Sequence, residues 1–152
     1  MFMKVLILSC EMGEGHNSAA KAVYEYFKKN NVECELLDAL SLKSEKASKF
    51  ASAAYLRVIK IPYLFGVIYA IGRLVSNLKI KSPVYYINRS YRQRLHDYIN
   101  DGAFDAIITT HLFPAESLTA LKREKALTAL TIGVNTDYTC IPFWEETELD
   151  YY

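Results

Sequence analysis

A histidine occupies a position in this chain where anion binding or proton transfer is chemically possible. In CEMGEGHNSAAK (residues 10–21), Gly13 and Gly15 flank Glu14, and His16 comes immediately before a helical pattern. Glycines permit positive φ and close approach of a ligand to the backbone, and the free N–H groups at a helix start favour an anion or a polar hydroxyl. The helix dipole opposes a second positive charge, which favours a neutral imidazole that can act as a general base.

Two other interpretations of this corner are open. His16 can serve structure alone, by packing against its neighbours or by capping the helix. GEGHNS also begins like the dinucleotide motif GxGxxG, and Asp38 lies 25 residues after Gly13, near the place where such folds bind a ribose. Because Ser18 stands where the third glycine belongs, the dinucleotide match is incomplete.

Polar residues also end two apolar runs farther along the chain. Thr110 and His111 end FDAIITTH, and Asp137 ends LTALTIGVNTD, with Glu116 shortly after the first run. Both runs predict strands, and ligands bind at the carboxyl ends of the strands in open α/β sheets. We therefore expect these residues near His16, where Asp137 orients an acceptor or a histidine. The alternative role for Asp137 is to cap a turn.

The elements that would position these residues alternate as in an α/β fold. KVLILS is a continuous apolar run, typical of a strand buried on both faces, and Asn17 or Ser18 is the expected N-cap of the next helix. Strand, glycine turn, helix and strand form a βαβ unit with parallel strands. We expect a Rossmann-like parallel sheet with helices on both faces. The predicted strands are 4–9, 32–40, 104–111 and 127–137, and the predicted helices are 17–30, 41–60, 82–100 and 114–124.

Composition limits the class of protein. The chain has 152 residues, of which 51% are hydrophobic, enough for a single domain with its own core. Its three cysteines are far apart and odd in number, which disfavours a disulfide framework or a zinc site and favours a reducing compartment. The apolar N-terminus runs straight into the glycine turn, so we interpret it as a buried strand rather than a signal peptide.

Charge is unevenly distributed along the chain. Residues 55–96 contain eight Lys and Arg and no acidic residue, and because the whole chain has a net charge of +1, the remainder carries −7. Seven Tyr and Phe residues are interleaved with these cations. Residues 61–72 carry no charge, but a bilayer span needs about 20 apolar residues. This composition indicates an interfacial segment whose apolar part enters the headgroup boundary and whose cations meet anionic lipid.

We assign residues 41–100 to this helical, membrane-associating segment. A buried helix hairpin with a solvated face is the alternative, and nucleic acid is disfavoured because the cations lie beside a long apolar run rather than along a polar groove. The candidate membrane-binding residues are Arg57, Lys60, Tyr63, Phe65, Val67, Ile68, Arg73, Lys79 and Lys81.

Taken together, KVLILSCEMGEGHNSAAKAV, FDAIITTHLFPAESL and VNTDYTCIPFWEETELDYY resemble the monogalactosyldiacylglycerol synthases and processive diacylglycerol glucosyltransferases. These are relatives of the bacterial enzyme that adds N-acetylglucosamine to the lipid-linked peptidoglycan precursor. The family pattern is a turn ending in GHxxAA, a strand end with Thr, His and Pro, and a TDY segment followed by tryptophan. The matching residues are His16, Ala19, Ala20, Thr110, His111, Pro114, Asp137, Tyr138 and Trp144. Glu14 departs from the pattern, since many relatives have glycine there.

The resemblance implies an inverting glycosyltransferase of GT-B type that uses no metal or cofactor. Residues 1–152 would form its single N-terminal, acceptor-binding domain, and a UDP-sugar would bind mainly to a C-terminal domain that this chain lacks, leaving the chain alone inactive. The acceptor would be a diacylglycerol hydroxyl, and the enzyme would lie peripherally on anionic lipid at the cytoplasmic face of the cell membrane. A non-catalytic lipid-docking module is the alternative.

The resemblance also implies roles for individual residues. His16 would remove the acceptor proton, and Asp137 would position the reacting groups. The residues expected to bind substrate are Gly13, Glu14, Gly15, Asn17, Thr110, His111, Pro114, Tyr138 and Trp144.

Overall fold

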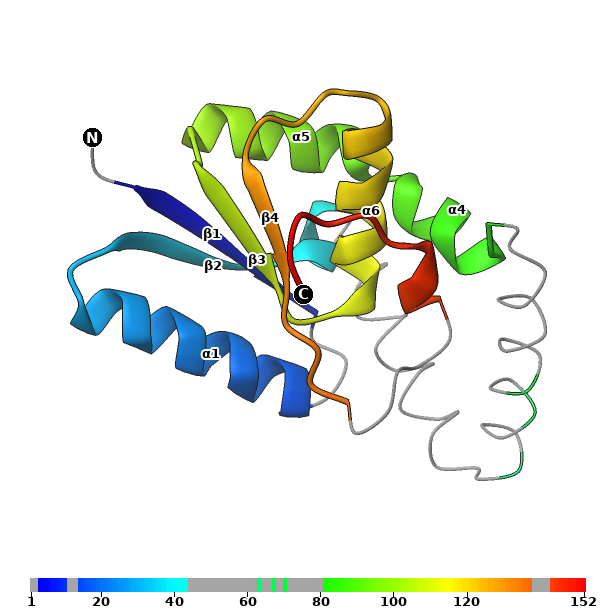
Figure 1. The fold of residues 1–152 in the computed structure, drawn as a ribbon, viewed down its shortest axis with the longest axis horizontal. Helices are drawn as coiled ribbons and strands as arrows, with labels where there is room; N and C mark the ends of the chain where they lie inside the picture. The colour runs from blue at the N-terminus through cyan, green and yellow to red at the C-terminus, as the bar shows by residue number, and fades with distance from the viewer. Residues whose placement is uncertain are drawn as a thin grey trace.

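Four parallel strands form the centre of the molecule (Figure 1). This computed structural model describes residues 3–10, 14–43, 63, 67, 70, 81–137 and 143–152. Strand β1 pairs with β2 and β3, and β4 pairs with β3, which gives the order β2-β1-β3-β4. The parallel α/β fold expected from the sequence is confirmed. The strands are β1 (Lys4–Ser9), β2 (Glu33–Asp38), β3 (Ala106–Thr109) and β4 (Leu130–Gly133), and the last three are shorter than predicted.

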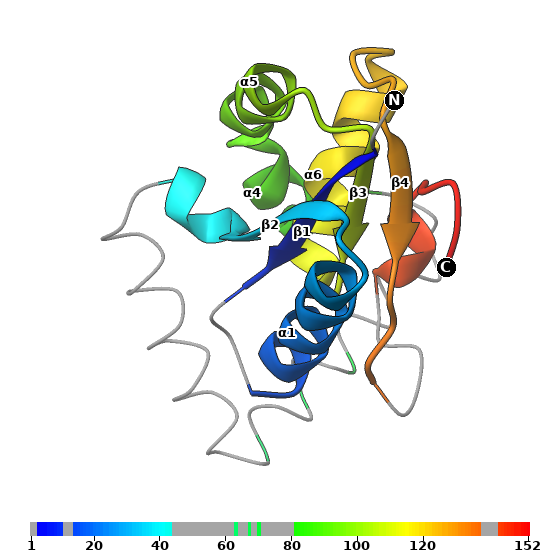
Figure 2. The same ribbon diagram turned by 90° about the vertical axis from the view of Figure 1, so that its left-hand side faces the viewer.

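Helices cover both faces of the sheet, as predicted (Figure 2). Side chains of β1 alternate between the faces because successive residues of a strand point in opposite directions. Val5 and Ile7 pack in the cluster that contains Ala20 of α1, whereas Leu6 and Leu8 pack in the cluster on the opposite face. That opposite face is covered by α5 and α6. The helices are α1 (Glu14–Lys29), α5 (Arg92–Gly102) and α6 (Leu112–Arg123).

Helix α1 begins earlier than predicted, at Glu14 rather than near residue 17. The expected N-caps Asn17 and Ser18 are therefore wrong, because both residues already lie within the helix. Gly15 is also helical and has no positive φ. The carboxylate of Glu14 in the first turn complements the positive end of the helix dipole, which favours this early start. His16 consequently lies inside the first helical turn rather than before it.

The predicted helix at 82–100 is two helices, α4 (Pro83–Arg89) and α5. Ser82 caps α4 by accepting a hydrogen bond from the Tyr85 N–H at 3.1 Å. The hydroxyl of Ser90 donates to the Ile87 carbonyl, competing with the regular backbone pattern where α4 ends. Helix α4 packs against α6, and α5 buries Leu95 in the core, so the C-terminal part of the segment assigned to 41–100 also belongs to the folded domain. The membrane association of this segment stays a prediction.

At the N-terminal end of the segment assigned to 41–100, the structure describes only residues 41–43. Asp38 ends β2 and caps the 3₁₀ turn η1 (Ala39–Leu42), with its carboxylate accepting from the Leu40 N–H at 3.1 Å. Asp38, which the dinucleotide interpretation placed near a ribose, therefore has a capping role in this structure. Apart from residues 41–43, the predicted helix at 41–60 lies outside the described residues.

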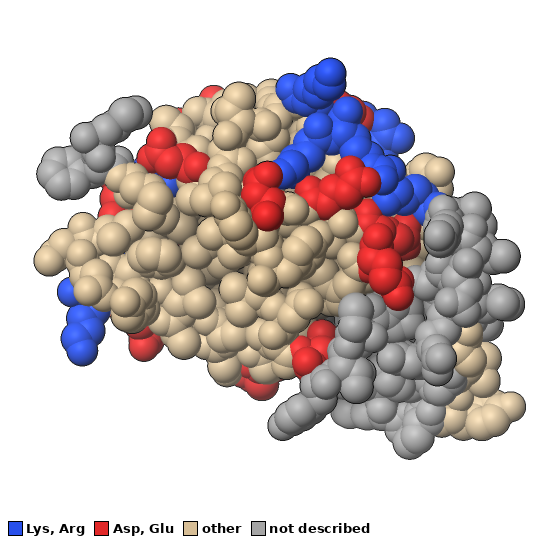
Figure 3. Space-filling view, viewed as in Figure 1, with Lys and Arg blue, Asp and Glu red and all other residues tan. Residues whose placement is uncertain are grey.

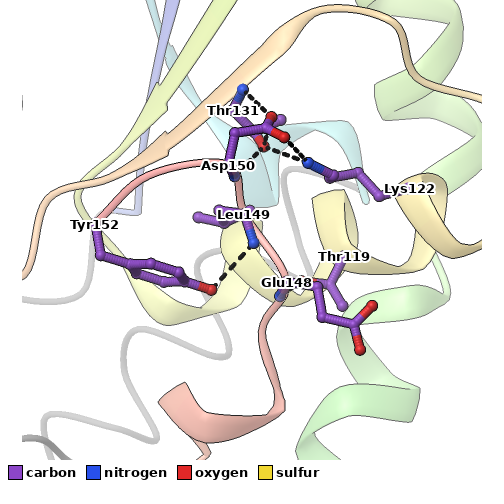
Figure 4. A network of polar contacts seen from close by, with 7 residues as sticks. All are labelled: Thr119, Lys122, Thr131, Glu148, Leu149, Asp150 and Tyr152. Carbon is purple, nitrogen blue, oxygen red and sulfur yellow. Dashed lines mark hydrogen bonds and ion pairs between the residues drawn. The ribbon is translucent and has the colours of Figure 1, made fainter.

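The last residues return to the outer edge of β4. They begin with the 3₁₀ turn η2 (Trp144–Glu146), and Tyr151 then forms a parallel bridge with Ile132. Asp150 accepts hydrogen bonds from the Thr131 N–H at 2.8 Å and the Thr131 hydroxyl at 2.7 Å, and it also pairs with Lys122 (Figure 4). These contacts fix the C-terminal segment against β4 and α6.

Candidate active site

His16 lies where three strands end, and its ring is held by residues from two of them. The Nδ1 atom is 2.9 Å from the Thr110 carbonyl oxygen, after β3, and 2.6 Å from Thr136 Oγ1, after β4. The Nε2 atom is 4.0 Å from Asp137 Oδ1, also after β4. The expectation that these strand ends bring His16, Thr110 and Asp137 together is confirmed.

The contact with Thr110 fixes which ring nitrogen carries the proton. A carbonyl oxygen can only accept a hydrogen bond, so Nδ1 must be the donor in the neutral ring. The Nε2 atom then keeps its lone pair. It lies beside the Asp137 carboxylate, and the His16 side chain is 15% exposed. In the described part of the chain Nε2 has no hydrogen-bond partner, so the geometry provides an accessible nitrogen that can accept a proton next to a group that would stabilise the resulting imidazolium.

Two more hydrogen bonds hold the start of α1 against the sheet edge. The Thr110 hydroxyl donates to the His16 carbonyl at 3.0 Å, so Thr110 contacts both the backbone and the ring of His16. The Ser9 hydroxyl at the end of β1 donates to Asn17 Oδ1 at 2.6 Å. These bonds tie the first turn of α1 to β1 and β3, and they restrict the position of the imidazole.

His111 has a structural position beside His16. It is the N-cap of α6, with Nδ1 accepting from the Phe113 N–H at 3.1 Å, and it is only 7% exposed. Burial, reinforced by the nearby His16, lowers the pKa of His111 to about 3, so the ring is neutral near pH 7. Its ring meets that of His16 edge to face at 4.7 Å. His111 therefore supports His16 through packing, and its predicted substrate contact stays a prediction.

With this geometry established, one comparison with known proteins identifies the family. The family model for monogalactosyldiacylglycerol (MGDG) synthase matches residues 16–152. This chain belongs to the MGDG synthase family. The resemblance expected from the sequence motifs is confirmed, and membership places the chain among glycolipid-synthesising glycosyltransferases. No curated protein and no solved structure gives a significant match.

The two described residues directly before His16, which is the first residue of the family match, border open space. Glu14 and Gly15 are exposed, and a Cβ placed on Gly15 would meet no described atom within 4 Å. A ligand group can therefore approach the first turn of α1 from this side. Gly13 and Tyr138, which were also predicted to bind substrate, lie outside the described residues.

Two other predicted substrate-binding residues are buried in this MGDG synthase family domain. Pro114 lies in the first turn of α6, and Trp144 is 5% exposed in the core, edge to face with the Tyr152 ring. The structure gives both residues a packing role, and their predicted contacts with substrate stay predictions.

Most of the predicted membrane-binding residues lie outside the described part of the chain. These are Arg57, Lys60, Phe65, Ile68, Arg73 and Lys79. Tyr63 and Val67 are helical and 84% and 39% exposed, and Ala70 is helical and exposed as well. Their spacing is that of one helix face. Lys81 is half-buried, and its Nζ donates to the Glu146 carbonyl at 2.6 Å.

Sequence reasoning assigned no site role to Thr136 and misplaced Glu116. Thr136 directly precedes Asp137, so its place at the same strand end was a usable signal. Glu116 lies on the buried face of α6 rather than at the edge, where Asn88 of α4 donates to its carboxylate. Burial raises the pKa of Glu116 to about 8, and Glu146 contributes to the increase.

The described residues contain no group of three or more His, Cys, Asp or Glu that is arranged to hold a metal ion. Within the same residues, no helix has the length and apolar character needed to cross a bilayer.

Proposed function

We propose that this chain is the acceptor-binding half of an enzyme that transfers a hexose from a UDP-sugar to the hydroxyl of diacylglycerol. The observation that carries the proposal is the arrangement of His16. One ring nitrogen is fixed by the Thr110 carbonyl, and the other is left free beside Asp137. A general base of this kind is what an acceptor hydroxyl needs in order to attack a sugar.

The proposed reaction is a single displacement. The acceptor oxygen forms a bond to the anomeric carbon, its proton moves to Nε2 of His16, and the bond from the anomeric carbon to the phosphate oxygen breaks. UDP leaves with that electron pair, and the configuration at the anomeric carbon inverts. Asp137 stabilises the imidazolium by its negative charge at 4.0 Å. The positive end of α1 faces the side from which the donor phosphates would approach.

The proposed place of reaction is the membrane surface. Tyr63 and Val67 expose aromatic and aliphatic surface in the middle of the chain, in a region whose sequence is basic and free of acidic residues. Such a surface suits insertion at the headgroup boundary of anionic lipid, where diacylglycerol resides. We assign the donor sugar mainly to a second domain and the enzyme to the cytoplasmic face of the cell membrane.

The test replaces His16 by glutamine in the enzyme that combines this chain with its donor-binding domain. Glutamine keeps an N–H for the Thr110 carbonyl but provides no base, so we expect hexose transfer to diacylglycerol in mixed vesicles to fall about 10²- to 10⁴-fold. His96→Gln, on the surface of α5, is the matched control and should leave transfer unchanged.

Two results would contradict the proposal. Near-normal transfer by the His16→Gln enzyme would exclude His16 as the base. No transfer by the unmodified enzyme, although it binds the vesicles, would instead support a lipid-docking module without catalysis.

A further inference from the structure

A cationic groove lies between α4 and α6, apart from the His16 site. Its volume is about 270 Å³. Figure 3 shows Lys and Arg side chains gathered in a strip on this side of the molecule, with acidic side chains along its border. The groove is lined by Lys81, Tyr85, Tyr86, Arg89, Ala120, Arg123 and Glu124.

The lining of the groove itself carries more positive than negative charge. It contains three cations and one carboxylate. Arg89 pairs with Glu124 at 2.8 Å, and Arg123 pairs with Glu148, whereas no ion pair of Lys81 is found among the residues that the structure describes. The pKa of Lys81 is lowered, first by burial and then by the positive charge of Arg123, while the carboxylates of Glu146, Glu148 and Glu116 act in the opposite direction. Lys81 and Arg123 therefore lie close enough for their positive charges to repel each other.

Hydrogen-bond donors are also left over in this region. Among the described residues, Lys81 Nζ donates one hydrogen bond, to the Glu146 carbonyl, and lies 4.8 Å from the centre of the Tyr85 ring, whereas an ammonium has three N–H groups. The Nε atom of Arg89 is enclosed and has no hydrogen-bond partner within the described part of the chain. A buried donor without an acceptor is unfavourable, so a rotation of the Arg89 side chain that brings Nε to an acceptor of a ligand would stabilise the groove.

The existing ion pairs would not prevent a ligand from binding. The Arg89 and Arg123 side chains are 41% and 42% exposed, and their glutamate partners are similarly accessible. Exposed pairs of this kind are worth only about 0–1 kcal/mol. Each guanidinium can therefore turn toward an anion in the groove while keeping part of its contact with glutamate.

We propose that this groove binds a phosphoryl group through Lys81, Arg89 and Arg123. Two guanidinium forks and one ammonium suit the several oxygens of a phosphate better than the two oxygens of a carboxylate. The phosphate belongs either to a soluble monoester or to the headgroup of an anionic lipid. Tyr86, which lines the groove, is 58% exposed, which suits a headgroup with apolar surroundings. The proposal does not depend on the transfer reaction.

The test uses two double variants that each remove two positive charges. Arg89→Gln/Arg123→Gln changes the groove and keeps Lys81 with its contact to Glu146. Lys28→Gln/Lys29→Gln changes the last turn of α1, which covers the opposite face of the sheet. Inorganic phosphate and glycerol 3-phosphate are titrated by calorimetry and by ¹⁵N chemical shifts of the chain. Flotation is measured with vesicles of phosphatidylcholine alone and with added phosphatidic acid. Thermal unfolding checks that both variants fold.

We expect phosphate to shift the amide signals of α4 and α6, and we expect binding to weaken about tenfold or more in the groove variant alone. Weaker flotation of that variant with phosphatidic acid supports the headgroup as the source. Unchanged flotation combined with weaker phosphate binding supports a soluble ester. The proposal is overturned if phosphate causes no localised shifts, or if both double variants lose the same affinity. The groove result stands whether or not His16→Gln abolishes transfer.

Discussion

Two polar clusters of this molecule differ in how many of their hydrogen-bonding groups are paired within the fold. In the His16 cluster, Thr110 and Thr136 contact one ring nitrogen, and the other nitrogen stays free at a partly exposed edge. In the cluster beneath α4, the carboxylate of Glu146 accepts from the buried Ser82 N–H at 2.8 Å, and Asn88 donates to Glu116. The first arrangement leaves an atom available for chemistry, whereas the second connects elements that are distant in sequence.

This comparison predicts that changes in the first cluster reduce turnover and that changes in the second reduce stability. The two effects are separable because no hydrogen bond or ion pair joins the two clusters within the part of the chain that the structure describes.

After the His16 variant, Asp137→Asn should have the largest effect on activity. The variant keeps the shape of the side chain and removes the charge that stabilises the imidazolium of His16, so we expect transfer to fall about tenfold to a hundredfold. The free energy of unfolding should change by less than about 0.5 kcal/mol, because the side chain is 29% exposed. Hexose transfer and urea unfolding are measured together, with Asp97→Asn on α5 as the control. A stability loss without a loss of transfer would reverse the assignment of this cluster.

The division between the clusters also explains what could be predicted from the sequence. His16, Thr110 and Asp137 end or follow apolar runs, and parallel strands bring their carboxyl ends to one edge, so local patterns suffice to place them together. Glu146 and Ser82 lie 64 residues apart, and their hydrogen bond depends on how η2 and α4 pack. No local pattern encodes that pairing. The same limit applies to Asp150 with Thr131, and it explains why Glu116 was misplaced at the edge.

Local chemistry overrode the sequence pattern at two helix boundaries. The helical periodicity of 82–100 continues through Ser90, but the Ser90 hydroxyl bonds to the Ile87 carbonyl and the chain divides into two helices. At the other boundary, a glycine pair suggested a turn, yet Gly15 adopts helical geometry after Glu14. Glycine permits a turn but does not require one.

Glu146→Ala should have the largest effect on stability. It leaves the buried Ser82 N–H without its acceptor, which costs about 2 kcal/mol, and it weakens the start of α4. Urea unfolding of the chain is the measurement, and Glu145→Ala at the exposed neighbouring position is the control. An unchanged unfolding midpoint for Glu146→Ala would show that this carboxylate does not hold α4 in place.

Glu116→Gln should change how stability depends on pH. The folded-state pKa of about 8 lies above the ordinary value of 4.5, so the folded protein holds a proton that the unfolded chain releases. The stability of the unmodified chain should therefore fall as the pH rises between 4.5 and 8, by about 1 kcal/mol per pH unit. Glutamine mimics the protonated acid and should flatten this slope.

The best window for that measurement is pH 6.5 to 8. Below it His111, whose folded-state pKa of about 3 lies under its ordinary value of 6.5, contributes a slope of opposite sign. Urea unfolding of Glu116→Gln and the unmodified chain is compared across this window. Parallel slopes for the two proteins would mean that Glu116 is ionised in the folded state.

Asp150→Asn should have the smallest effect, because its contacts lie at the surface. Hydrogen bonds from Lys122 and Thr131 lower the pKa of Asp150 to about 2, below its ordinary value of 3.8. This contribution to stability is present above pH 3.8 and is lost as the pH falls toward 2. Asparagine lacks the charge at every pH, so we expect a loss of about 1 kcal/mol at pH 7 that disappears near pH 2. A loss of stability that persists in acid would assign the effect to the Thr131 hydrogen bonds rather than to charge. Glu148→Gln, which removes another exposed ion pair, is the control and measures how much a surface pair contributes without those hydrogen bonds.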